Sequence, residues 1–240
     1  MPQPRTRTRH SSRPVNGDGP PASTQVKCGF DCLAWKEPMR SLLLATTNAH
    51  KLEEYHAIFS GLPYSLLSLR DVQLDLDVDE TGTSFAENAE LKALAYSKAS
   101  GLLSLADDSG LEIDALGGAP GIYSARFVSR DTSYEERFRL ILEQLKGLPL
   151  EKRTARFRCA IALAEPSGYH RVVEGIAEGA IADAPRGTNG FGYDPIFLVP
   201  ELGKTFAELP SDLKNRISHR GRAAQKARAL LANWPQSPSS

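Results

Sequence analysis

The sequence has no excess of charge of either sign, because its 29 Lys and Arg residues are balanced by 29 Asp and Glu residues. Proteins whose main partner is nucleic acid usually carry a basic excess, so this balance argues against that class. Long apolar runs are also missing, which argues against a membrane span, and no apolar stretch near the N-terminus suits export. These absences predict a cytoplasmic protein that binds neither nucleic acid nor a membrane.

Cysteine is scarce, with three residues among 240, and no disulfide framework is visible. Cys159 lies in the alternating run 157–161, where a small buried thiol fits a strand. Cys28 and Cys32 form at most half of a metal site, since no second pair of ligands is evident. The remaining composition, 41% hydrophobic and 24% charged, can bury one large core or two closely packed lobes.

Residues 1–38 are rich in Pro, Gly, Ser, Thr and Arg, and they have almost no apolar periodicity. Such a segment cannot offset its ordering entropy by burial, so we expect a disordered N-terminal extension. Its arginines could touch an acidic partner, although a short solvated basic tail is the simpler interpretation. Met39 directly precedes the first expected strand, which suggests that translation begins there. We expect one domain over 39–234 and a flexible tail over 235–240.

Strands and helices follow one another without an internal repeat. Expected strands cover residues 41–45, 102–106, 155–164, 171–177 and 196–199, and expected helices cover 52–59, the segments that begin after Ser84 and Ser133, and 220–231. Ser84 and Ser133 each precede a Glu by three residues, which is the pattern of a capping box. Beyond residue 110, Leu111, Ile113 and Ala115 alternate. This order predicts an α/β fold with a mixed sheet.

The segment Thr46–Lys51 joins the first expected strand to the first expected helix. Hydroxyl and amide side chains close the turn, the first helical N–H groups lack intrahelical partners, and Lys51 adds positive charge. An anionic ligand is the natural occupant of such a corner. The plainer alternative is that Asn48 only caps the helix and that Lys51 is solvated.

Carboxylates gather in two places. Asp107 and Asp108 follow an apolar strand and precede Ser-Gly, so we expect a tight turn at the strand end that exposes them to a cleft. Adjacent aspartates repel each other, and a Mg²⁺ ion or a cationic partner would relieve the repulsion. An ordinary Asx turn is the alternative. The second acidic cluster comprises Asp75, Asp77, Asp79 and Glu80. A solvated loop would have the same composition.

Cationic and aromatic side chains complete the pattern. Lys92 lies four residues after Asn88, so both project from one helix face toward a ligand. The glycine-rich segment 187–195 combines two aromatic rings with a carboxylate, which suits stacking on a base, although core packing would also use the rings. A cluster of basic residues precedes the last helix and consists of Lys214, His219 and Arg220. These residues could also be exposed cations at the helix end. Metal-binding acids, phosphate-binding cations and a stacking loop together favour a nucleoside triphosphate.

Six blocks, in this order, resemble the inosine/xanthosine triphosphate pyrophosphatase family over most of residues 40–232. The blocks are 46–51, 80–89, 106–111, 117–126, 190–195 and 218–221. The resemblance implies an elongated, twisted, mixed sheet flanked by helices, with two lobes around a central substrate cleft. It also implies that a homodimer uses Mg²⁺ to hydrolyse ITP, dITP and XTP to the nucleoside monophosphate and pyrophosphate, which cleanses the nucleotide pool.

The family pattern implies a role for each matching residue. Phosphates would be held by Thr46, Thr47, Asn48, Ala49, His50 and Lys51, and the metal by Glu80 and Asp108. Asp108 would also be the proton acceptor. Beyond what the resemblance implies, we expect Asp107 to assist around the metal. Further substrate contacts would come from Lys92, Ser109, Phe191, Gly192, Tyr193, Asp194, Lys214, His219 and Arg220. Thr47 stands where many relatives have Gly, and Asp79 is an alternative to Glu80 as metal ligand.

Base choice and function class stay open at this point. A donor from Arg220 or His219 would favour an oxo group at purine C6 and reject the amino group of adenine, whereas the element that excludes guanine is not evident. The same phosphate machinery would serve damaged pyrimidine or methylated triphosphates. A module that senses ITP without cleaving it would use the same contacts, although the adjacent Asp107 and Asp108 argue for catalysis. A nucleic-acid-binding role would rest on the arginine-bearing tail alone.

Overall fold

The computed structural model describes residues 39–235. The expectations for 1–38, including those for Cys28 and Cys32, and for residues 236–240 lie outside the described part. The strands are β1 Arg40–Leu44, β2 Tyr64–Ser68, β3 Leu103–Ile113, β4 Thr154–Ala164, β5 His170–Ile181, β6 Phe197–Val199 and β7 Lys204–Thr205. The α-helices are α1 Ala49–Ile58, α2 Phe85–Ser100, α3 Tyr134–Gln144, α4 Ser211–Ile217 and α5 His219–Ala232, with short 3₁₀ helices between them.

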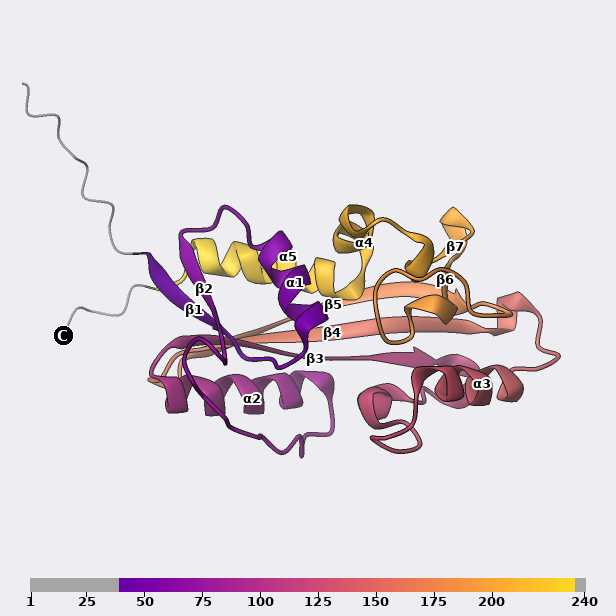
Figure 1. The fold of residues 1–240 in the computed structure, drawn as a ribbon, viewed down its shortest axis with the longest axis horizontal. Helices are drawn as coiled ribbons and strands as arrows, with labels where there is room; N and C mark the ends of the chain where they lie inside the picture. The colour runs from indigo at the N-terminus through magenta and orange to yellow at the C-terminus, as the bar shows by residue number, and fades with distance from the viewer. Residues whose placement is uncertain (1–38, 236–240) are drawn as a thin grey trace, which may run out of the picture. The chain divides into compact units, whose positions relative to one another are not determined.

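The strands of the described chain form one sheet in the order β2-β1-β3-β4-β5-β6-β7. β1 is parallel to both of its neighbours, and the other pairs are antiparallel, which confirms the predicted mixed α/β fold. Helices α1, α4 and α5 cover one face of the sheet, and α2 packs against the other (Figure 1). Cys159 of β4 is buried, as predicted. Within residues 39–235, the helices are too short or too polar to cross a bilayer.

β3 is the strand on which the core is organised. Leu103 and Leu105 belong to an apolar cluster with α1 and α5, whereas Leu111 and Ile113 belong to a second cluster with α3, β5 and β6. Because side chains alternate along a strand, Asp107 lies on the same face as these four residues, between the two clusters. A third cluster packs the opposite face against α2. The polar centre of β3 therefore interrupts an apolar stripe, and neighbouring residues there point to opposite sides of the sheet.

The prediction that this strand ends at Ala106 is wrong. The strand continues through the two aspartates to Ile113, and β4 pairs with it along this length. Asp-Asp-Ser-Gly is a local turn signal, but the ladder hydrogen bonds and the cations that neutralise Asp107 outweigh it. The carboxylates thus emerge from the middle of a strand rather than from a turn. Ala115, which was expected to continue the alternation, lies in the 3₁₀ helix η1 (Asp114–Leu116).

The helix starts follow the capping rules. Asn48 caps α1, and the hydroxyls of Ser84 and Ser133 accept N–H bonds at the starts of α2 and α3. The capping box at α2 is half formed, because the Glu87 carboxylate accepts from the Thr83 N–H at 2.6 Å instead of the Ser84 N–H. The sequence pattern does not predict β2 or α4, which are short and bury few apolar side chains.

Gly175 of β5 lies at a close approach between α5 and the sheet, because a Cβ added there would clash with the His219 carbonyl oxygen and the Ala223 backbone. We predict that Gly175→Ala lowers the free energy of unfolding by about 1–3 kcal/mol, since α5 must shift to make room. Urea denaturation measures the change. The matched control is Gln225→Ala on the exposed side of α5, which should unfold like the wild type. Wild-type stability of Gly175→Ala would contradict the packing argument.

Candidate active site

A cavity of about 760 Å³ is lined by segments from α1, α2, β3 and the loop before the 3₁₀ helix η4 (Asp194–Ile196). Most residues that the sequence singles out line it: Thr46, Thr47, Asn48, Lys51, Glu80, Lys92, Asp108, Ser109, Phe191, Gly192, Tyr193, Asp194, Lys214, His219 and Arg220. Ala49 and His50 do not line it, and both are exposed at the start of α1. The fold thus gathers segments that are far apart in the sequence around a single cavity.

The corner before α1 is built on Asn48. Its side-chain oxygen accepts from the N–H groups of His50 at 3.0 Å and Lys51 at 3.3 Å, and its own N–H donates to the Thr46 hydroxyl at 3.2 Å. Asn48 is therefore the helix cap of the plainer interpretation, and the same turn still lines the cavity. Because this cap uses two N–H groups of the helix, an anion here would depend mainly on hydroxyl groups and on the Lys51 ammonium.

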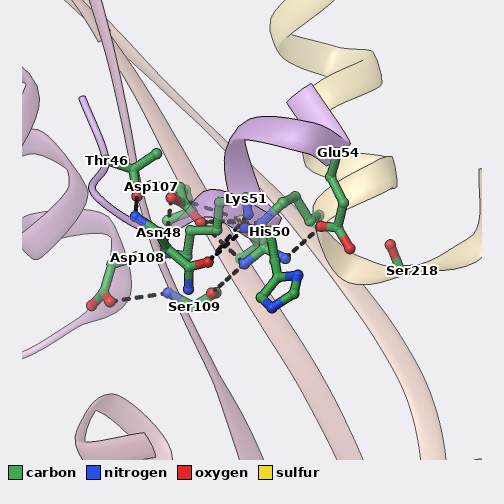
Figure 2. Close-up of polar contacts among 12 residues, drawn as sticks. Thr46, Asn48, His50, Lys51, Glu54, Asp107, Asp108, Ser109 and Ser218 are labelled. Carbon is green, nitrogen blue, oxygen red and sulfur yellow. Dashed lines mark hydrogen bonds and ion pairs between the residues drawn. The ribbon is translucent and has the colours of Figure 1, made fainter. Parts of the chain in front are cut away.

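Asp107 is held between two cations, of which Figure 2 labels Lys51 and the other is Arg220. Lys51 Nζ lies 2.9 Å from one carboxylate oxygen, and Nε and Nη2 of Arg220 each lie 3.3 Å from the other. Burial alone would raise the pKa of Asp107, but Lys51 and Arg220 outweigh it and hold that pKa well below its usual range. This geometry favours a role in anchoring the two cations over the predicted assistance to a metal.

Asp108 points away from Asp107 (Figure 2), and its carboxylate contacts α2. Asn88 Nδ2 donates to the Asp108 carboxylate at 3.1 Å, and the Lys92 ammonium lies 3.8 Å away, so these two residues of α2 meet at one carboxylate as their spacing predicts. Burial raises the pKa of Asp108, although Lys92 opposes the shift. A carboxylate with a raised pKa accepts a proton more readily, as a general base requires.

Glu80 faces the same ammonium from the loop before α2. One of its oxygens lies 2.6 Å from Lys92 Nζ, and the other lies 2.9 Å from Arg126 Nη1. Burial would raise the pKa of Glu80, but these cations outweigh it and lower that pKa. Asp79 is exposed and makes no ion pair with another described residue. Glu80, rather than Asp79, therefore faces the Lys92 ammonium together with Asp108.

The aromatic loop and the cluster of basic residues lie together at the cavity. Phe191 lies against Lys214 and Arg220, whose cationic groups are 4.9 and 5.2 Å from the ring centre. His50 stacks on the same ring at 5.2 Å, so its contact is with the loop rather than with the cavity. The alternative of exposed helix-end cations is wrong for Lys214 and Arg220, because both are buried.

His219 is buried and stacks on Phe157 with the ring centres 4.4 Å apart. Its Nδ1 has no hydrogen-bond partner within the described chain. Burial, helped by the positive charge of Arg220, holds the pKa of His219 well below its usual value. The imidazole therefore stays neutral at the wall of the cavity.

The sequence pattern missed Glu54 and Arg126 as site residues. Glu54 of α1 accepts from Lys214 Nζ at 2.9 Å and from Arg220 Nη1 at 2.8 Å, so it joins the two buried cations. Its position one helical turn after the corner lysine was the available signal. Arg126 ends one of the six sequence blocks, but nothing local in the sequence pairs it with Glu80.

A sequence model of the Ham1 family matches residues 42–230. The chain belongs to the Ham1 family. A curated relative named dITP/XTP pyrophosphatase, from Geobacter sulfurreducens, is 51% identical over 185 residues, which cover 77% of this chain and 93% of the relative. Another of that name, from Gloeobacter violaceus, is 53% identical over 188 residues, which cover 78% and 92%. The solved structure of a HAM1 protein from Coxiella burnetii matches with a TM-score of 0.75 and 41% identity, over 81% of this chain and 100% of that one.

For this Ham1 chain we predict that Asp107→Asn lowers the free energy of unfolding by about 3–5 kcal/mol at neutral pH, because two cations lose a buried counter-charge. The pKa of Asp107 is lower in the folded than in the unfolded state. Its contribution is therefore complete above about pH 5 and is lost as the pH falls below about 4. Urea denaturation across this range measures both effects. A variant that loses stability in acid as steeply as the wild type would contradict the assignment.

Proposed function

We propose that this chain hydrolyses the non-standard purine nucleoside triphosphates dITP, ITP and XTP to the nucleoside monophosphate and pyrophosphate. The observation that carries the proposal is the shared cavity that Lys51, Lys92, Glu80 and Asp108 line, in which the Lys92 ammonium faces both of these carboxylates. Membership of the Ham1 family supports an enzyme of the nucleoside triphosphate pyrophosphatase class, since curated relatives carry that name. The expected homodimer and the cytoplasmic location stay predictions.

A divalent cation suits the two carboxylates that face Lys92. Mg²⁺ prefers oxygen ligands, and proteins usually supply one or two carboxylates while substrate phosphates and water complete the shell. Among residues 39–235, no group of three or more His, Cys, Asp or Glu residues is arranged to hold a metal. Glu80 and Asp108 would hold Mg²⁺, which when bound supplies charge neutralisation for the phosphates.

Asp108 would orient and deprotonate the attacking water, because its buried carboxylate has a raised pKa and lies at the cavity wall. Lys92 donates to the main-chain oxygen of Asp107 at 2.7 Å, which fixes its ammonium beside the base. Lys51 and Lys92 would stabilise the negative charge on the phosphates and on the departing pyrophosphate. The reaction needs no covalent intermediate with the protein.

His219 and Arg220 suit the recognition of an oxo group at purine C6. His219 lines the cavity as a neutral imidazole, whose ring N–H would donate to such an oxygen. Arg220 is held by Glu54 and Asp107, so its guanidinium presents a fixed edge to the cavity. The amino group of adenine would bring a donor against these donors and leave them unpaired, which supports a preference for oxo purines.

A nucleotide panel tests the proposal. Purified protein with Mg²⁺ should release monophosphate and pyrophosphate from ITP, dITP and XTP, with kcat/KM about 10²-fold or more above that for ATP. Equal turnover of all bases, with GTP included, would contradict the account of base choice. Binding of ITP without release of pyrophosphate would favour a sensing module, and a preference for methylated or pyrimidine triphosphates would favour the other substrate class.

We predict that Asp108→Asn lowers kcat by about 10²–10⁴-fold with a much smaller change in nucleotide Kd, because the amide keeps the shape of the side chain but cannot accept the proton. Steady-state kinetics at saturating Mg²⁺ and equilibrium binding separate the two quantities. Asp75→Asn, at an exposed residue outside the cavity lining, is the matched control and should behave like the wild type. Near-normal turnover by Asp108→Asn would overturn the assignment of the base.

A further inference from the structure

Arg126 lies at the cavity beside the proposed metal ligands. It ends the 3₁₀ helix η2 (Gly121–Arg126), and its Nη1 lies 2.9 Å from one oxygen of Glu80. Lys92 lies 2.6 Å from the other oxygen, so each oxygen of this carboxylate faces a cation. The side chains of Arg126 and Glu80 are 27% and 25% exposed, so a ligand in the cavity can reach both.

The backbone on both sides of Arg126 is fixed. Buried Arg137 of α3 donates to the carbonyl oxygens of Ser124 at 3.2 Å and Ser129 at 3.0 Å. The Tyr193 hydroxyl donates to the same Ser124 oxygen at 3.0 Å, which ties the segment to the aromatic loop. A segment that is held on both sides of an arginine presents the guanidinium at a defined place instead of leaving it as a mobile surface group.

The same segment contains a strained residue. Val128 has φ 71°, and β-branched side chains rarely adopt this left-handed region because Cβ crowds the backbone. Val128 is also 63% exposed, so burial of its own side chain does not explain the conformation. Strain of this kind persists where the surrounding structure imposes it, and it clusters at functional sites. Here it lies two residues after Arg126, within the span that Arg137 holds.

A divalent cation held by Glu80 would compete with Arg126 for the same carboxylate. It would leave the guanidinium without its counter-charge at the wall of a cavity that would receive the polyphosphate of the proposed substrate. We propose that Arg126 is a positioning residue, which holds Glu80 while the divalent cation is absent and transfers to the polyphosphate when the cation binds. The inference rests on the proposed function, and it makes metal binding and polyphosphate binding cooperative through one arginine.

The test compares two affinities that should change in opposite directions in Arg126→Gln. Without nucleotide, the variant should bind Mn²⁺ about threefold to tenfold more tightly than the wild type, because the competing cation is gone. With Mg²⁺ present, it should bind tripolyphosphate more weakly by a similar or larger factor, because a phosphate contact is lost. Electron paramagnetic resonance of free Mn²⁺ and titration calorimetry measure the two constants, and Arg126→Lys should restore part of the tripolyphosphate affinity.

Arg130 provides the matched control, because it lines the same cavity but makes no hydrogen bond or ion pair with another described residue. Arg130→Gln should leave the Mn²⁺ affinity unchanged. If Arg126→Gln weakens both affinities, Arg126 has only a structural role. An Mn²⁺ affinity that is the same in variant and wild type also overturns the inference. So does the absence of measurable Mn²⁺ binding in both proteins. These outcomes leave the proposed function intact if the wild type hydrolyses ITP, whereas a wild type that releases no pyrophosphate from any nucleotide defeats the proposed function itself.

Discussion

The site depends on the buried contact between Asp107 and Arg220. It joins the middle of β3 to the first turn of α5, and Lys51 extends the contact to α1. A buried carboxylate is tolerated only when nearby charges and hydrogen bonds replace the water that it loses. The two cations supply that compensation, so they fix both helices against β3 at the place where two apolar clusters meet. The corner before α1 and the first turn of α5 are held in register by the same ion pairs.

The alternation of side chains along β3 gives two neighbouring aspartates different chemistry. Asp107 meets two cations in direct contact, and its pKa falls, whereas Asp108 meets an amide and a more distant ammonium, and burial raises its pKa. One carboxylate is therefore a permanent anion that organises the site, and the other is suited to accept a proton. Environment, rather than residue type, separates an anchor from a base.

The residue types of the site were predictable from the sequence, because short blocks with fixed spacing carry them. The two helix starts at Asn48 and Ser84 were predictable as well, since capping depends on local hydrogen bonds. The continuation of β3 through Asp107 was not, because its local turn signal yields to pairing with β4 and to cations from distant helices. Glu54 was missed for the same reason: its partners lie about 160 residues away in the sequence.

The ion pairs at the two ends of the cavity differ in how deeply they are buried. This difference separates a rigid end from an end whose ion pairs can be exchanged. Lys214 and Arg220 are almost fully buried with their carboxylate partners, and breaking such pairs is costly because it leaves a charge without compensation. The pairs of Glu80 with Lys92 and Arg126 are less buried, so water can reach their charges and breaking one of these pairs costs less. Under the proposed function, a metal and a polyphosphate would therefore change the partners of Glu80 and Arg126 at one end of the cavity, while the other end stays rigid. That rigidity is what discrimination between bases requires, since a misplaced donor in a fixed site stays unpaired.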